Sequence, residues 1–418
     1  MKSIFYGEKR GSHTLLLVST IVPIVTLFFA SLTTYSTFIV FPFWALWLVC
    51  IFTVQPGLSK DEQSFMKVSF FLLAIILLYK FAGYSEMDRG GLIRVINWIF
   101  AGVVSVFAMK TFTSRELSIL YIVLNFALIG LLIFFIIAGR AIMAFEEQNE
   151  AATVTSTWYG SMYMLLTGIN LIVFLHVKKL FVRLISLIFL VLTLYLNFFI
   201  MQRGTNVIFT LVEIGLILVF LLKRKTVIIS LSVVLIGIAF YVISADLLVN
   251  FFDWLSDVIP SERLASRFRE LTIALEYENI NASKGSLSTR SELMGVSWQT
   301  FTSNFLCFIL GAGEHLDDYT IIGHHSFLLD TLARYGIIGG FLVFLYFKKQ
   351  YQIIMTFLDK KKNWALYMQC LIVFFIYLLR NYYGDMATDV VNFFILLYLP
   401  LTFQVINYYS NNQNRFKI

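Results

Sequence analysis

The sequence predicts an all-α polytopic membrane protein with about twelve transmembrane helices and a long helical loop between the ninth and the tenth. The first reason is composition: of 418 residues, 59% are hydrophobic and 14% are charged, whereas a soluble domain carries about 25% charged residues. The second is a series of apolar stretches close to the length of about 20 residues that crosses a bilayer. The third is the aromatic content, 17% of the chain, which is typical of lipid-facing and interfacial surfaces.

Nine apolar segments precede the long loop and three follow it. They are expected to span the membrane at residues 14–32, 37–54, 66–84, 92–109, 118–138, 158–176, 181–201, 205–222, 226–244, 327–347, 364–383 and 388–407. Residues 1–244 then carry the first nine helices, 245–326 form the extracytoplasmic loop, and 327–418 contain the last three helices and a cytoplasmic tail. The basic stretch Met1–Arg10 precedes an apolar run long enough to remain a membrane helix, so no cleavable signal is expected.

The net charge of +7 follows the membrane topology and does not indicate nucleic-acid binding. If the N-terminus is cytoplasmic, the basic clusters Lys178–Lys179, Lys223–Lys225 and Lys360–Lys362 all fall on the cytoplasmic side, and acidic Glu146 and Glu147 fall outside. The positive-inside rule is then obeyed at most short loops. We therefore expect both termini in the cytoplasm and the long loop on the outer face.

The three cysteines, Cys50, Cys307 and Cys370, lie far apart in apolar stretches without a C-x-x-C pattern. We expect them to be small buried hydrophobic residues and not a disulfide framework or a metal site.

The long loop has the pattern of a helical cap. Pro260-Ser261-Glu262 is typical of a helix start, and Thr289 with Glu292 predicts a capping box at the start of a second helix. Between them, Asn279–Ser288 is polar. Apolar residues at spacings of four, three and four give the first helix one apolar face: Leu264, Phe268, Leu271 and Leu275. A cap of this kind on the outer membrane face can shelter a reaction from water.

Arg203 lies in a very tight turn between the seventh and eighth helices, in the stretch MQRGTN, where Gly204 supplies backbone freedom. The eighth helix begins there with its amide groups and positive dipole end directed outward. The guanidinium group of an arginine beside a helix N-terminus can bind phosphate. The alternative is an interfacial arginine that reaches lipid phosphates; its position against the positive-inside bias favours a functional role.

The stretch HHSFLLDTLARYGIIGG begins the tenth helix with His324 and His325. A histidine at a helix N-terminus is held neutral by the dipole and can serve as a general base. Asp330 and Arg334 are four residues apart and can pair, or Arg334 can hold phosphate. Gly336 and Gly340 share that spacing and permit close helix contact. The nearby acidic and histidine residues fit no strong metal signature, so no metal is expected: Glu314, His315, Asp317 and Asp318.

Further charged residues have open interpretations. Arg269 is expected to be a solvated helix charge, and Arg267 can be either solvated or substrate-binding. Arg380 lies near the outer face and is a further candidate for lipid phosphate. Glu213, in mid-segment of the eighth helix, indicates either a proton-coupled role or, slightly favoured, an internal pair with Lys80, Arg94 or Arg380.

Three motifs resemble the O-antigen polymerase and O-antigen ligase superfamily of bacterial inner-membrane glycosyltransferases. His325 is followed by ten residues and then Gly336, similar to the H-x10-G element of the polymerases. RSELMGVSWQTFTSNFLCFILGAGEH resembles the arginine, aromatic and G-x-G run before that element, and QRGTN resembles the S-R-G turn before the long loop. Together they cover about residues 200–340. Arg334 stands where the ligases often have an acidic residue, which favours a polymerase.

The resemblance implies a GT-C-like enzyme that joins glycans carried on undecaprenyl pyrophosphate, without a metal or cofactor. Arg203 and Arg290 would bind the pyrophosphate and stabilise it as leaving group, and His325 would deprotonate or orient the acceptor hydroxyl. The other substrate-binding candidates are Arg267, His324, Arg334 and Arg380. Expected partners are the lipid-linked glycans, membrane lipids, a chain-length regulator and a flippase, with no nucleic acid.

Two other functions stay open on the sequence. A ligase would transfer the glycan to lipid A-core instead of to a second repeat unit. A lipid-linked oligosaccharide flippase would also have about twelve helices and intramembrane charges, but it would show two related halves and would not need a large structured loop on one face.

Overall fold

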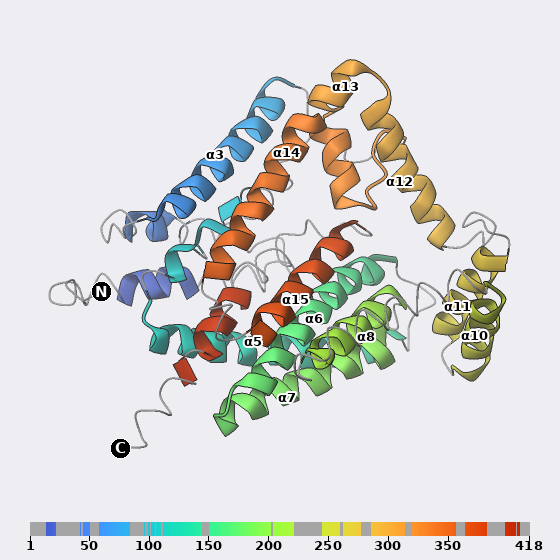
Figure 1. Ribbon diagram of the computed structural model, residues 1–418, viewed down its shortest axis with the longest axis horizontal. Helices are drawn as coiled ribbons and strands as arrows, with labels where there is room; N and C mark the ends of the chain where they lie inside the picture. Colours follow the sequence, from blue (N-terminus) through green and yellow to red (C-terminus); the bar gives the residue numbers. More distant parts are fainter. Residues whose placement is uncertain are drawn as a thin grey trace.

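The computed structural model describes residues 14–21, 42, 45–50, 58–83, 96, 99–100, 102–104, 106–109, 112–143, 150–201, 204–220, 245–259, 262–276, 286–313, 320–356, 364–382, 398–406 and 408–409. Within these ranges the chain is helical, with turns and short links and no strand (Figure 1). Four of the described helices are long and apolar enough to cross a membrane, at Lys60–Phe81, Ser114–Phe134, Leu180–Phe198 and Phe327–Thr356. The prediction of an all-α membrane-embedded protein is confirmed.

Helices α3 (Lys60–Phe81) and α14 (Phe327–Thr356) form an antiparallel pair. At one end, Lys349 Nζ lies 3.8 Å from Asp61 Oδ1. At the other end, the rings of Tyr79 and Tyr335 are 5.6 Å apart. The basic end of α14 and its histidine-bearing start therefore lie at opposite ends of this pair.

A second group of helices lies beside this pair, and the helix axes of the group are inclined much like those of α3 and α14 (Figure 1). It comprises α5 (Ser114–Met143), α6 (Glu150–His176), α7 (Leu180–Tyr195) with the π-helical turn η1 (Leu196–Met201), α8 (Gly204–Val219) and α15 (Trp364–Tyr382). Buried hydrogen bonds cross between them: Tyr121 Oη donates to Asn170 Oδ1 at 3.1 Å, and Gln369 Nε2 donates to the Ile217 carbonyl at 3.0 Å. Such bonds satisfy polar groups that have no water partner within a membrane.

Every predicted span except 226–244, which lies outside the described residues, contains helical residues. Several boundaries were predicted wrongly because hydropathy marks only the apolar part of a helix. Helix α3 begins six residues earlier than expected, at Lys60, behind a capping box of Ser59 and Glu62. Helix α6 already starts at Glu150, one of the acidic residues that the sequence predicts in an outer connection. Helix α14 continues nine residues beyond 347, since Gln350, Ile353 and Ile354 are buried in the bundle.

The segment 245–313 contributes four helices on one side of the molecule, at the right and top of Figure 1. Helices α10 (Ala245–Val258) and α11 (Glu262–Glu276) pack together, with the rings of Phe252 and Phe268 stacked at 5.9 Å. Helix α11 begins where the sequence predicts. Helix α12 (Ser286–Thr302) begins three residues before the predicted capping box, which lies inside its first two turns. A short helix, α13 (Phe305–Leu310), follows.

Glu213 is fully buried on α8, against the backbone of Gly168 on α6. Neither carboxylate oxygen has a hydrogen-bond partner among the residues that the structure describes. The internal pair favoured by the sequence is therefore not seen in the described part of the chain; Arg94 and the side chain of Arg380 lie outside it. A β-carbon on Gly168 would lie 2.1 Å from Glu213 Oε1. Only glycine at position 168 therefore leaves enough space for the carboxyl group.

Gly168→Ala is expected to lower the free energy of unfolding by about 1–3 kcal/mol, because the added methyl group overpacks a buried contact. Thermal unfolding in detergent measures the loss. Gly215→Ala is the matched control, since a β-carbon at Gly215 of α8 meets nothing within 4 Å. The double variant Gly168→Ala/Glu213→Ala should recover part of the lost stability. Equal melting of the Gly168 and Gly215 variants would show that the carboxyl group does not depend on this glycine.

Candidate functional site

Residues Gly323–Ser326, which we call the histidine turn, lead into the start of α14. His324 has a φ of 56°, in the left-handed region that residues with a β-carbon seldom adopt. Its Nδ1 lies 2.9 Å from Nη2 of Arg334, one of the predicted substrate-binding residues. A guanidinium group only donates hydrogen bonds, so Nδ1 of His324 is the acceptor. Two predicted site residues are thus in direct contact, and this contact helps to hold the strained turn.

His325 is half-buried, and its ring has a defined orientation. Its Nδ1 lies 2.9 Å from the carbonyl oxygen of His324. Because a carbonyl oxygen only accepts, Nδ1 carries the proton, and in the neutral ring Nε2 carries the lone pair. An imidazole held in this tautomer can accept a proton at Nε2, as a general base does. Nδ1 of His324, in contrast, accepts a hydrogen bond from Arg334, and the choice of His325 as the base stays a prediction.

A buried hydrogen-bonded chain fixes the histidine turn to both neighbouring helices. The amide of Gly323 donates to Ser297 Oγ of α12 at 2.9 Å, and that hydroxyl donates to Asp330 Oδ1 of α14 at 2.5 Å. Oδ2 of Asp330 accepts from the amide of Ser326 at 3.2 Å. The sequence predicts that Asp330 can form an ion pair with Arg334. In the structure, Asp330 accepts the hydrogen bonds that join α12, the histidine turn and α14.

The turn also packs directly on the backbone of α12. A β-carbon on Gly323 would lie 1.8 Å from the carbonyl oxygen of Leu293. Near it, Thr300 Oγ1 donates to the Ile321 carbonyl at 2.6 Å. Arg290 precedes Leu293 by three residues, which is about 4.5 Å along the helix axis. The α12 turn that carries Arg290 is therefore adjacent to the turn that carries His324 and His325.

Arg290 belongs to a group of charges shared by α11 and α12. Burial lowers the pKa of the Arg290 guanidinium from its ordinary value, and the charge of Arg267 lowers that pKa further, while Glu270 acts in the opposite direction. Arg267 Nη1 lies 2.6 Å from Glu270 Oε1. Two guanidinium groups thus lie within electrostatic range of each other and of this carboxylate, an arrangement that favours a bound anion.

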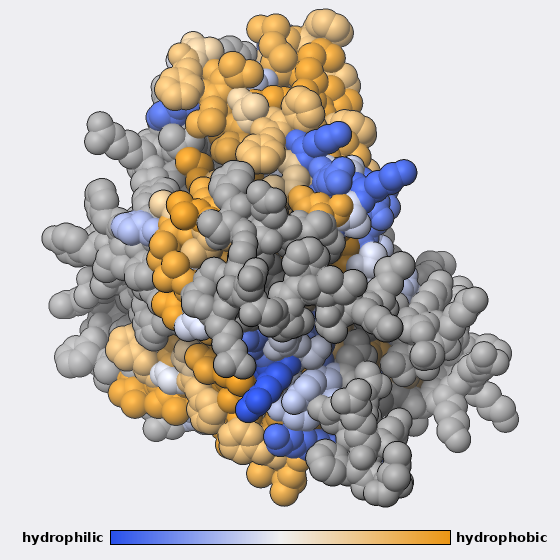
Figure 2. Space-filling model, turned by 90° about the vertical axis from the view of Figure 1, so that its left-hand side faces the viewer, coloured by the Kyte–Doolittle hydropathy of each residue, from blue (hydrophilic) through white to orange (hydrophobic). Residues whose placement is uncertain are grey.

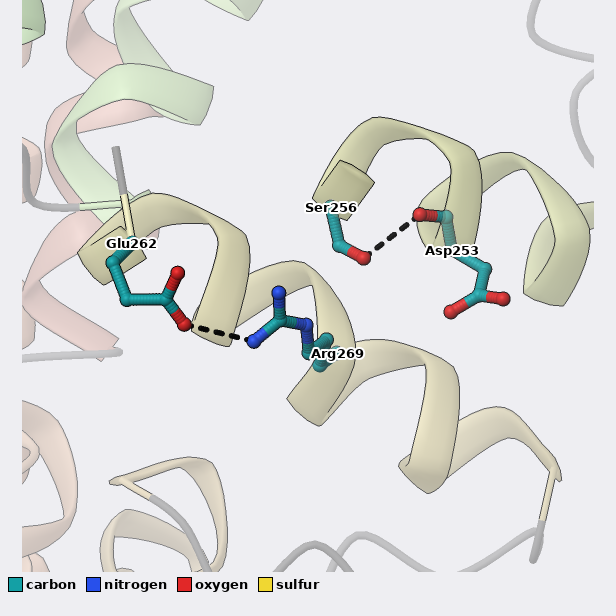
Figure 3. A network of polar contacts seen from close by, with 4 residues as sticks. All are labelled: Asp253, Ser256, Glu262 and Arg269. Atoms are coloured by element: carbon teal, nitrogen blue, oxygen red, sulfur yellow. Dashed lines mark hydrogen bonds and ion pairs between the residues drawn. The ribbon is translucent and has the colours of Figure 1, made fainter. Parts of the chain in front are cut away.

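Arg269 has a different environment, which Figure 3 shows. Its Nη1 lies 2.9 Å from Glu262 Oε1 across two turns of α11, and both side chains are exposed. On α10, the Ser256 hydroxyl donates to the carbonyl oxygen of Asp253 at 2.8 Å. An exposed ion pair contributes about 0–1 kcal/mol, so the expectation of a solvated charge at Arg269 agrees with the structure.

Several predicted residues lie outside the described part of the chain. Arg203 and the stretch 314–319, with His315 and its acidic neighbours, are among them, and Arg380 is described only as helical backbone of α15. Among the described residues, no group of three or more histidine, cysteine, aspartate or glutamate side chains is arranged to hold a metal ion. The described part of the site therefore consists of His324, His325 and Arg334 on one side and Arg267 and Arg290 on the other.

Sequence reasoning missed Ser297 and Gly323. Neither has a signal in the periodicity of its own segment, because each acts through a partner more than 25 positions away. It also expected Gly336 and Gly340 to permit close helix contact. At Gly336 this is confirmed, because a β-carbon there would lie 2.3 Å from the Ile309 carbonyl oxygen of α13, and Gly336 also marks a kink in α14, with φ 61° and ψ −164°. A β-carbon on Gly340 would instead meet Leu332 of the same helix.

No protein-family model matches this chain, and no curated protein matches it.

Proposed function

We propose that this protein is a membrane glycosyltransferase that polymerises oligosaccharide repeat units carried on undecaprenyl pyrophosphate into O-antigen or capsular polysaccharide. The support is a histidine with a basic nitrogen at Nε2 beside a helix turn that carries a partly buried arginine. The chemistry needs both groups: a proton acceptor for the attacking hydroxyl and fixed positive charge for the departing pyrophosphate.

We further propose a GT-C-like arrangement of twelve spans in the bacterial cytoplasmic membrane, with both termini in the cytoplasm. Residues 245–326 would then form the outer cap. The separation of the Lys349 end of α14 from the histidine turn favours this orientation, because basic residues collect on the cytoplasmic side. The flippase and chain-length regulator of the same pathway would be its partners.

In the proposed reaction the acceptor hydroxyl attacks the anomeric carbon of the donor glycan. His325 Nε2 takes the hydroxyl proton as the new carbon–oxygen bond forms. The bond from the anomeric carbon to the phosphate oxygen breaks, and undecaprenyl pyrophosphate leaves with the electron pair. Arg290 and Arg203 would neutralise the charge on that leaving group, with Arg267, Arg334 and Arg380 as further phosphate contacts. Direct displacement inverts the anomeric configuration, and the chemistry needs no metal or cofactor.

The observation that carries the proposal is the contact of Gly323 with the Leu293 carbonyl. It brings a half-buried guanidinium and an imidazole whose Nδ1 is bonded to a carbonyl oxygen into one region, from segments more than 30 residues apart. Arg269, by contrast, lies on the exposed surface of α11.

His325→Ala and Arg290→Ala are each expected to reduce chain extension by about 10²-fold or more, because one removes the general base and the other a fixed charge on the leaving group. The assay uses purified protein in liposomes with synthetic undecaprenyl-pyrophosphate repeat units and measures polymer ladders on gels. His325→Ala should mainly lower kcat and should change its pH profile. Arg203→Ala is expected to behave as Arg290→Ala does.

Two variants serve as matched controls. Arg269→Ala removes an exposed arginine from α11, and His176→Ala removes a histidine that contacts Gln369 at the other end of the bundle. Both should retain polymer synthesis. Normal ladders from the His325 and Arg290 variants would exclude the proposed site. Transfer only to lipid A-core would identify a ligase, and movement of the lipid across liposomes without new bonds would identify a flippase.

A further inference from the structure

Helix α13 lies in the loop that the sequence predicts to face water, yet its surface is apolar. Phe305 is 81% exposed and Leu306 56% exposed. Nearby on α3, Leu78 and Phe81 are 65% and 82% exposed. Figure 2 shows hydrophobic side chains over the upper part of the molecule, where Figure 1 places α13 and the end of α3. Cys307, expected to be buried, lies partly exposed on this helix, whereas Cys50 and Cys370 are buried as predicted.

The surface of α13 is continuous with a membrane-facing surface. The Tyr79 hydroxyl of α3 donates to the Leu310 carbonyl, so the end of α13 is fixed on the outer end of a candidate transmembrane helix. Toward α12, the rings of Phe308 and Phe301 are 5.0 Å apart. No charged residue occurs between Ser303 and Gly313. The exposed apolar side of α3 thus lies next to α13, with Lys80 in the last turn of α3, where a lysine can extend its ammonium group toward the headgroups.

Polar groups at both ends of α13 form hydrogen bonds within the protein. At the start, Asn304 Oδ1 accepts from the Cys307 amide at 2.8 Å. The Gly311 amide donates to the Cys307 carbonyl at 2.8 Å. After it, the amides of Ala312 and Gly313 donate to the carbonyls of Ala333 and Arg334 on α14, at 2.7 and 3.0 Å.

The hydroxyl groups just before α13 also bond to their own helix. Thr302 Oγ1 donates to the Trp298 carbonyl at 2.9 Å, and Ser303 Oγ donates to the Thr300 carbonyl at 2.9 Å. A segment in water has no need to satisfy its polar groups internally, but a segment in hydrocarbon must do so.

We propose that α13 is immersed in the acyl chains of the outer leaflet and anchors the cap to the bilayer. Trp298, half-exposed on α12, then lies at the level of the lipid headgroups, where tryptophan is enriched. The anchor holds α12 at the membrane surface, and with it the turn that bears Arg290. This inference takes the outer leaflet from the proposed orientation of the chain, and it does not depend on the glycosyltransferase activity.

The test attaches an environment-sensitive fluorophore to Phe305→Cys, in a protein with Cys307→Ser, reconstituted in liposomes. Phe70→Cys, on the lipid-facing side of α3, is the membrane control, and Glu262→Cys, on exposed α11, is the water control. Lipids with a nitroxide on the acyl chain should quench the probe at 305 as they quench the probe at 70. Aqueous iodide should quench it at least about fivefold less than at 262, because hydrocarbon excludes the ion.

Two results would overturn the proposal. Iodide quenching at 305 equal to that at 262 would place α13 in water. Protection of the probe from both iodide and the lipid nitroxides would mean that another protein, or a second copy of this chain, covers the surface. Neither result would bear on the polymerase assay, since the two experiments have separate readouts.

Discussion

Gly336→Ala is expected to abolish the folded state or to lower its free energy of unfolding by more than about 3 kcal/mol. The backbone of Gly336 has φ 61° and ψ −164°, a combination that is essentially confined to glycine. A β-carbon there would also lie 2.3 Å from the Ile309 carbonyl oxygen and 2.6 Å from the Gly311 nitrogen. Both are backbone atoms, so no side chain can move aside to make room.

The kink at Gly336 has a consequence for the chain that packs against it. Next to it, the carbonyls of Ala333 and Arg334 accept from the amides of Ala312 and Gly313. A β-carbon at position 336 would therefore disturb both the contact between α13 and α14 and the conformation of α14. The start of α14, with Arg334 and its contact to His324, would lose its support.

Fluorescence-detected gel filtration after heating measures this loss for small amounts of membrane protein. Gly295→Ala is the matched control on α12, because a β-carbon there meets nothing within 4 Å. Alanine in a helix interior should leave stability unchanged or raise it by up to about 1 kcal/mol. If Gly336→Ala melts at the same temperature as Gly295→Ala, the kink is not required for the fold.

The helices were predictable because their signal is local. Phe327 begins α14 where the apolar period begins, and α15 matches the predicted span within one residue. The kink in α14 was not predictable, because Gly336 looks like any small residue in an apolar helix. Its conformation depends on the 309–313 segment, which reaches it from another helix. The start of α3 at Lys60 was not predicted for a related reason, because the polar first turn of a helix carries capping residues and has no hydropathy signal.

For the candidate site, the sequence indicates residue types more than geometry. Histidine and arginine at the start of a predicted membrane helix indicate a polar site. The sequence could not show that Arg334 would contact His324 or that Asp330 would bond to Ser297, because several hydrogen-bonding partners are available to each. The folded structure made the choice for both residues, whereas the tautomer of His325 follows from a local contact of Nδ1 with the carbonyl oxygen of the preceding residue.

Asp330→Ala is expected to lower the free energy of unfolding by about 3–5 kcal/mol. Asp330 is 1% exposed, and it accepts from the Ser297 hydroxyl and the Ser326 amide. Without the carboxylate both donors stay buried, and each unsatisfied group costs about 1–3 kcal/mol. The lost packing of the side chain adds to this cost. Ser291→Ala, an exposed change on α12, should stay within about 0.5 kcal/mol of the unchanged protein.

A double-mutant cycle with Ser297→Ala separates the hydrogen-bonded chain from the general effect of each substitution. Ser297→Ala alone removes the acceptor of the Gly323 amide and the donor to Asp330. Since both residues belong to one chain of bonds, their effects should be non-additive by about 1–2 kcal/mol. Hydrogen exchange of the Gly323 and Ser326 amides should accelerate in either variant, because both amides bond to this chain. Additive stability losses with unchanged exchange would mean that the histidine turn is held by its packing on the Leu293 backbone and not by Asp330.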